Sequence, residues 1–170
     1  TMQFYDEIQN RDPRLSQTVR APGYTRVGQT TRLAPDFGAT VTGYQLIKFV
    51  SAPSQDINNR SLTPMPIFRY AEVLLNYAEA KAELGTLLQS DIDKSIKLLR
   101  DRVGMPDLDV AAANANPDPV MESAYPNVSG PEKGAILEVR RERRIELVME
   151  GFRWNDLMRW AAGSCEVRQY

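Results

Sequence analysis

The longest regular pattern of apolar residues follows Pro64-Met65-Pro66 and predicts a helix from about Ile67 to Leu84. At about 100° per residue, its polar side chains fall on one narrow arc, and nearly all of the remaining circumference is apolar. A helix that is apolar on most sides is expected to be buried by neighbours on more than one side. Gly85 supplies a stop after the last apolar residue. The polar arc consists of Arg69, Glu72, Asn76, Glu79 and Glu83.

A second apolar stripe predicts another helix, from about Asp91 to Val103, with Ser90 as its cap. Gly104 and Pro106 end this helix. Because only a short turn separates the two helices, residues 67–104 are expected to form a helical hairpin. The stripe consists of Ile92, Ile96, Leu99 and Val103.

The last third of the chain predicts a charged helix from about Glu132 to Met149, interrupted at Gly151. Trp154 to Ala162 predicts a short further helix, so residues 132–162 carry both. Residues 105–131 are rich in proline and in clustered Ala and Asn, which is typical of a loop.

Residues 1–66 are rich in Pro, Gly, Thr and Asn and show no sustained helical periodicity. Only the stretch from Tyr44 to Val50 could form a short strand. Long loops of this kind are uncommon in compact domains, and they are often functional or packed on something else. The pattern as a whole predicts a mainly α fold of helix pairs, with long irregular loops and little strand.

Composition narrows the class of function. The chain has 170 residues, 42% apolar and 25% charged, which is ordinary for one soluble globular domain. A net charge of −1 gives no broad attraction for nucleic acid or anionic lipid. With one cysteine, no intrachain disulfide is expected, and the absence of histidine removes the commonest metal ligand and general base. No apolar run is long enough to span a membrane, and the first residues form neither a signal peptide nor a lipidation signal.

The charged helix allows two interpretations. The run Arg140-Arg141-Glu142-Arg143-Arg144 resembles a basic patch for an anion, but Glu138, Glu142, Glu146 and Glu150 recur every four residues beside it. Glutamates at this spacing repel one another on an isolated helix, which favours a network of partly buried ion pairs.

A carboxylate-pair enzyme built on Glu142, Glu146 and Asp156 is disfavoured, because arginines close in sequence would keep these carboxylates ionised. The sequence contains no Gly-rich phosphate loop, serine nucleophile elbow or cysteine metal pair. We therefore expect no catalytic residue, no metal site and no cofactor.

Two segments resemble signatures of the SusD/RagB family. Residues 69–80 read RYAEVLLNYAEA, almost letter for letter the sequence of that family's helix. Residues 142–160 are similar to its pattern ERR-x-EL-x-x-EG-x-R-x-x-DL-x-RW. Asn10–Leu15 resembles an upstream element, and Gly104-Met105-Pro106 lies at the family's position after the hairpin. The resemblance extends from about residue 10 to residue 161.

The resemblance implies a fold of tetratricopeptide-like helix pairs with long loops. It also implies a lipid-anchored, surface-exposed protein of the bacterial outer membrane that captures oligosaccharides or other polymer-derived nutrients, without catalysis. The implied partner is a TonB-dependent, SusC-like transporter. Because members of the family are longer, residues 1–170 are expected to be the C-terminal part of one SusD-like domain, with the anchor upstream.

The resemblance assigns the matched motifs a structural role and implies that ligand contacts come from loops and aromatic residues. The candidate ligand residues are Tyr24 beside Arg26, and Tyr44 beside Gln45, although packing on the core is the simpler explanation for them. Trp154 and Trp160 are expected to be packed inside. The structural signature consists of Arg69, Tyr70, Glu72, Glu79, Glu142, Arg143, Arg144, Glu146, Glu150, Arg153, Asp156 and Trp160.

The alternative function is a cytoplasmic tetratricopeptide adaptor that binds peptides in a helical groove. Such an adaptor would explain the hairpin but not the long loops or the charged helix. It should also show self-similarity at about 34 residues, and this sequence contains only one hairpin.

Overall fold

The computed structural model describes residues 4–64 and 66–161 of the chain. By their contacts, the residues separate into two compact units, Thr1–Ile67 and Phe68–Tyr170. We call them the loop unit and the helical unit. The boundary lies directly before the helix that the sequence predicts most strongly.

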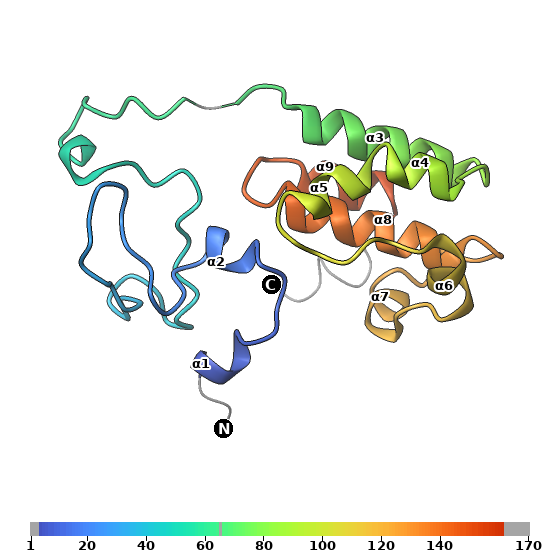
Figure 1. Ribbon diagram of the computed structural model, residues 1–170, viewed down its shortest axis with the longest axis horizontal. Helices are drawn as coiled ribbons and strands as arrows, with labels where there is room; N and C mark the ends of the chain where they lie inside the picture. Colours follow the sequence, from blue (N-terminus) through green and yellow to red (C-terminus); the bar gives the residue numbers. More distant parts are fainter. Residues whose placement is uncertain (1–3, 65, 162–170) are drawn as a thin grey trace. The chain divides into compact units, whose positions relative to one another are not determined.

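The loop unit consists mainly of turns and irregular segments, as expected from its composition (Figure 1). Its regular elements are short: α1 (Phe4–Glu7), α2 (Leu15–Thr18) and one 3-10 turn (Pro53–Gln55). The strand expected at 44–50 is reduced to one antiparallel bridge between Val19 and Leu46.

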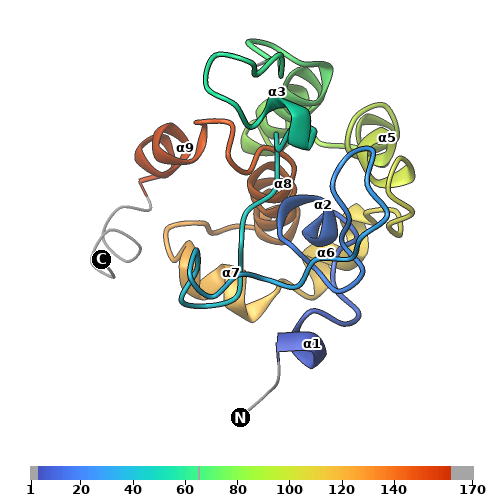
Figure 2. The ribbon, with the colours of Figure 1, turned by 90° about the vertical axis from the view of Figure 1, so that its left-hand side faces the viewer.

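The helical unit contains seven helices within its described residues, which confirms the expected mainly α fold (Figure 1). Helix α8 runs through the middle of this unit, with α3, α5, α6 and α7 packed around it (Figure 2). The helices are α3 (Tyr70–Glu83), α4 (Gln89–Asp93), α5 (Ile96–Asp101), α6 (Val110–Ala115), α7 (Pro119–Ala124), α8 (Lys133–Glu146) and α9 (Arg153–Arg159).

Helix α3 begins three residues later than the sequence predicts. Ile67 and Phe68 are 81% and 84% exposed, so neither has a core to pack against. Arg69 precedes the helix with an extended backbone, φ −140° and ψ 153°. The proline-flanked apolar start of the pattern is therefore an entry segment and not a helical turn.

The expectation that α3 is buried on several sides is only partly met. Its core face is buried, and the polar arc meets arginines of α8 and α9. The remaining face is open in the described residues, because Tyr70, Val73 and Leu84 are 69%, 58% and 74% exposed.

The second predicted helix is divided into α4 and α5 at Ser95. This residue is fully buried, and its hydroxyl donates a hydrogen bond to the Asp91 carbonyl at 2.6 Å. A serine hydroxyl that binds a backbone carbonyl competes with helical hydrogen bonding, which explains the break. Ser90 is not the cap, since α4 begins one residue before it and the Asp91 carboxylate accepts the Leu88 N–H at 3.0 Å.

The segment predicted as a loop at 105–131 contains α6 and α7. Each begins at an aspartate whose carboxylate accepts backbone N–H groups. Asp109 accepts from Ala112 at 2.9 Å, and Asp118 accepts from Val120 at 2.8 Å. Helices of six residues are too short to show a convincing apolar period, so the available signals were the capping aspartates and Pro119 at the start of α7.

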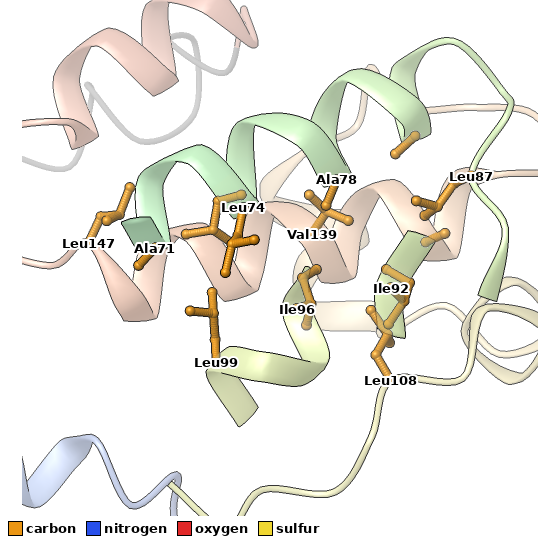
Figure 3. Packing of buried hydrophobic residues seen from close by; sticks show 13 residues of the cluster. Ala71, Leu74, Ala78, Leu87, Ile92, Ile96, Leu99, Leu108, Val139 and Leu147 are labelled. Carbon is orange, nitrogen blue, oxygen red and sulfur yellow. The ribbon is translucent and has the colours of Figure 1, made fainter. Parts of the chain in front are cut away.

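The main core lies between α3, α4, α5 and α8 (Figure 3). Leu75, Ile92 and Ile96 are completely buried in it, and Val139 of α8 is 1% exposed. A second cluster surrounds Tyr125 and Trp160, with Leu137 of α8 as a member. Helix α8 therefore contributes to both cores.

Helix α6 crosses α8 at very close range. A Cβ on Gly134 would lie 1.9 Å from the Ala113 carbonyl oxygen, so only glycine fits there. The Asn114 side chain accepts the Ala135 N–H at 2.7 Å, and its amide donates to Glu132 at 2.9 Å. Asn114 therefore satisfies an N–H group in the first turn of α8 that has no partner within the helix.

Candidate functional site

Arg143 on α8 joins three helices of the charged network. Its Nε donates to both carboxylate oxygens of Asp156 on α9, at 2.9 and 2.8 Å. Its Nη1 donates to Asn76 on α3 at 2.7 Å. Because Arg143 and Asp156 are only 5% and 3% exposed, each supplies the charge that makes burial of the other tolerable.

Glu79 on α3 is held from the other side by the end of α9. The Arg159 guanidinium pairs with both of its carboxylate oxygens, one of them at 2.9 Å. The Trp160 indole donates to Glu79 at 2.6 Å. The glutamate is 6% exposed, so the two donors replace water that it has lost.

Arg69 ties the start of α3 to the end of α8. It donates to the Glu146 carboxylate at 2.7 Å and to the Glu150 carboxylate at 2.6 and 2.9 Å. A further bond at 2.7 Å reaches the Glu146 carbonyl, one of the last carbonyls of α8. The positive charge of Arg69 near the C-terminus of α8 also interacts favourably with the helix dipole.

Three more arginines belong to the network around α8. Arg100 of α5 binds Glu142 at 2.8 Å, and Arg102 binds Glu146 at 2.9 Å. Arg140 reaches back to Glu83 on α3 at 2.9 Å. The prediction that the charges of α8 form ion pairs with neighbouring segments is confirmed by these contacts.

The network gives the basic run little capacity for an external anion. Arg140 and Arg143 are each 5% exposed and engaged with carboxylates. The carboxylates proposed for an enzyme are engaged as well: Glu142 is 1% exposed and accepts from Arg100. The arrangement suits the joining of helices, and Glu142, Glu146 and Asp156 are too deeply buried to meet a substrate.

The remaining signature residues are placed differently. Arg153 donates to the Tyr125 hydroxyl at 2.9 Å, beside the second core. Arg144 is exposed, Glu72 is half-buried, and Tyr70 lies on the open face of α3.

The two tryptophans have different environments. Trp160 is 4% exposed, as expected, and stacks edge-on against Tyr125 with ring centroids 5.7 Å apart. Trp154 is 58% exposed, so the expectation that it is packed inside is wrong for the described part of the chain. It lies in the first turn of α9, whose buried residues are Asp156 and Leu157 in the following turn.

Tyr24 in the loop unit is half-buried and lies beside an arginine that the sequence analysis did not single out. The Arg20 guanidinium carbon is 5.7 Å from the centre of the Tyr24 ring, within the range of a cation–π contact. The Tyr24 carbonyl accepts the Leu33 N–H at 2.9 Å, which closes the intervening loop.

Arg26 makes a bidentate ion pair with Asp56, with Nη1 and Nη2 at 2.6 and 2.7 Å. Its Nη2 also donates to the Ser51 carbonyl at 2.6 Å. Hydrogen bonding to this guanidinium lowers the pKa of Asp56. Arg26 therefore connects its own loop to the segment from Ser51 to Asp56, and both of its terminal nitrogens have hydrogen-bond partners.

Tyr44 is half-buried and interacts with the opposite end of the loop unit. Burial raises the pKa of Tyr44, and a hydrogen bond to Glu7 raises it further. Of the three candidate ligand residues, Tyr24 lies beside Arg20, which in turn bonds to Gln45. Arg26 pairs with Asp56, and Tyr44 interacts with Glu7.

Arg20 was missed because it belongs to no motif. The signal lies in the pairing of two segments: the Arg20 N–H donates to the Gln45 carbonyl at 2.8 Å, and the Ile47 N–H donates to Thr18 at 2.8 Å. Recognising this pairing in the sequence would have required the register between 18–20 and 45–47, which the imperfect alternation at 44–50 does not give.

Within residues 4–64 and 66–161, no three His, Cys, Asp or Glu side chains are grouped to hold a metal ion. In the same part of the chain, no helix combines the length and the apolar character needed to cross a membrane.

Comparison with known proteins identifies the family. No curated protein and no solved structure matches the chain. The model of the SusD family matches residues 1–170, and this range includes both motifs and the network of ion pairs that they form. The chain belongs to the SusD family.

Proposed function

We propose that this chain is a non-catalytic, glycan- or nutrient-binding component of an uptake system in the bacterial outer membrane. The observation that carries the proposal is the match of the SusD family over residues 1–170. Membership in this family indicates a nutrient-binding accessory protein associated with the outer membrane. The specific assignments, which are an oligosaccharide ligand, a TonB-dependent SusC-like partner and a lipid anchor on the full-length protein, are part of the proposal.

The different contacts of the helical unit and the loop unit support this function. Charged residues of the matched motifs form ion pairs that join the helices, such as Arg143 with Asp156 and Arg69 with Glu150. Groups engaged in this way build a rigid support and leave recognition to other segments. The loop unit has the side chains that sugar binding needs, an aromatic ring at Tyr24 beside polar donors.

The direct test is purification of the tagged full-length protein from membranes of its native host, with its partners identified by mass spectrometry. We expect recovery from the outer-membrane fraction together with a TonB-dependent barrel. A soluble protein that brings down cytoplasmic partners would contradict the proposal and favour a tetratricopeptide adaptor.

A further inference from the structure

Arg14 and Arg26 of the loop unit each form an ion pair with a carboxylate, whereas Arg20 does not do so with any described residue. Arg14 pairs with Asp12 at 2.6 Å, and Arg26 pairs with Asp56 at 2.6 Å. Arg20 instead donates from Nη1 to the neutral amide oxygen of Gln45 at 2.7 Å. No carboxylate among the residues that the structure describes lies within ion-pair distance of it.

The uncompensated charge is partly withdrawn from water. Arg20 is half-buried, and its Nε–H is sealed from solvent without a hydrogen-bond partner in the described structure. A cation withdrawn from water without a counter-charge is unfavourable, and a bound anion would offset that cost.

Two donors, one on Arg20 and one on Gln45, remain open. Nη2 of Arg20 bonds to no described residue, and it is not among the nitrogens sealed from solvent. The Gln45 amide oxygen accepts from both Arg20 and the Asp36 N–H, the latter at 3.0 Å. These two donors identify the accepting atom as the amide oxygen, and the Nε2 donor of the same amide has no partner among the described residues.

The charge of the loop unit agrees with an anionic ligand. Residues 1–67 contain seven Lys and Arg against five Asp and Glu, a balance of +2 in a chain whose net charge is −1. The positive field is therefore concentrated in the unit that contains Tyr24.

We infer that Arg20, Tyr24 and Gln45 form a subsite for a carboxylate-bearing sugar, such as a uronic acid unit of an acidic oligosaccharide. The carboxylate accepts hydrogen bonds from Arg20 Nη2 and Gln45 Nε2, and the Tyr24 ring supplies the apolar contact beside them. This inference rests on the proposed function and specifies its ligand class. Arg26 is then a positioning residue, because its bond to Ser51 and its ion pair with Asp56 fix the loop that bears Tyr24.

The test uses calorimetric titration of the full chain with a panel of neutral and uronate-containing oligosaccharides. Each acidic member that binds is then compared with its neutral methyl ester. We expect the acid to bind roughly tenfold to a hundredfold more tightly than the ester, with an affinity that falls as salt is added.

Three variants locate the preference. Arg20→Gln is expected to bring the affinity for the acid down to that for the ester, while Arg20→Lys retains part of the preference. The matched control is Arg32→Gln, which removes the same charge from an exposed position of the same unit and should leave the preference intact. Thermal unfolding of each variant establishes that it is folded.

The outcomes separate the two proposals. Equal affinity for acid and ester, or equal effects of Arg20→Gln and Arg32→Gln, would overturn the subsite while leaving oligosaccharide capture in place. Failure of every neutral and acidic oligosaccharide to bind would overturn oligosaccharide capture and the subsite together.

Discussion

At the scale of single residues, arginines connect the helices of the helical unit. In the described part of this unit, three arginines are buried, and Arg100, Arg140 and Arg143 each reach a carboxylate on another helix. Two nitrogens of Arg140 have no hydrogen-bond partner among the described residues, and its guanidinium carbon lies 5.3 and 4.9 Å from the ring centres of Tyr125 and Trp160. The aromatic faces thus take the place of acceptors for this arginine.

Glu138 is the member of the network whose charge opposes folding. Burial raises the pKa of Glu138, and the nearby carboxylates Asp118 and Glu142 raise it further. The positive charges of Arg141 and Arg100 lower this pKa, but the net shift is upward. A carboxyl whose folded pKa is raised above its unfolded value destabilises the fold when it is ionised. Its cost is therefore absent below the unfolded pKa and fully present above the folded pKa.

We predict that Glu138→Gln raises the free energy of unfolding at pH 7. The gain should shrink as pH falls and vanish near pH 4, where the wild-type glutamate is itself protonated. Urea unfolding at both pH values measures it. A loss of stability at pH 7 would mean that the 2.8 Å ion pair with Arg141 outweighs the burial of the charge.

Met149 carries backbone strain in the turn after α8. Its φ is +64°, in the left-handed region, and its side chain is 45% exposed. Met149→Gly removes the steric conflict and little burial, so we predict a gain of a few tenths to about 1 kcal/mol after the entropy of the unfolded glycine is subtracted.

The matched control for this turn is Met158→Gly on α9. Met158 is similarly exposed, at 51%, but helical, so glycine there should cost about 1 kcal/mol. Thermal unfolding of the two variants measures both effects, and losses of similar size would show that the turn is not strained.

At the scale of elements, the sequence predicts α3 and α8 because each repeats its pattern over several turns. It fails at α4 and α5, where the apolar stripe continues through a backbone break at Ser95. Periodicity reports which face is buried and is insensitive to one serine hydroxyl that bonds to a carbonyl. The short α6 and α7 were missed because tertiary contact with α8 stabilises them, not a period of their own.

The crossing of α6 and α8 gives an element-scale prediction. In an open helix Gly→Ala is stabilising, but at Gly134 the added methyl would meet Ala113 backbone atoms at 1.9 and 2.4 Å. We predict that Gly134→Ala destabilises the helical unit by about 1–3 kcal/mol through overpacking. Hydrogen exchange should show faster opening of residues 110–115, and an increase in stability would show that α6 does not pack as described.

At the scale of the whole molecule, the sequence identified the family and the helical scaffold better than the candidate site. The motifs are long and contiguous, so matching them needs no knowledge of contacts. The subsite depends on Arg20 meeting Tyr24 and Gln45, and such a meeting of irregular segments leaves no periodic trace. From the sequence, Tyr24 was paired with Arg26 and Gln45 with Tyr44, whereas the charge of Arg26 is already matched by Asp56.

We propose that the charged network supports the fold and that the loop unit binds the ligand. The most direct measurement compares Arg143→Ala and Tyr24→Ala in the full chain. For each variant, stability is measured by urea unfolding, and affinity by titration with the tightest-binding oligosaccharide of the panel.

Arg143→Ala should lose roughly 3–5 kcal/mol of stability, because Asp156 is left buried without its Arg143 partner. The affinity of this variant per folded molecule should be unchanged. Tyr24→Ala should leave unfolding of the helical unit unchanged and weaken binding. Normal stability together with lost binding in Arg143→Ala would show that the network binds the ligand and does not support the fold.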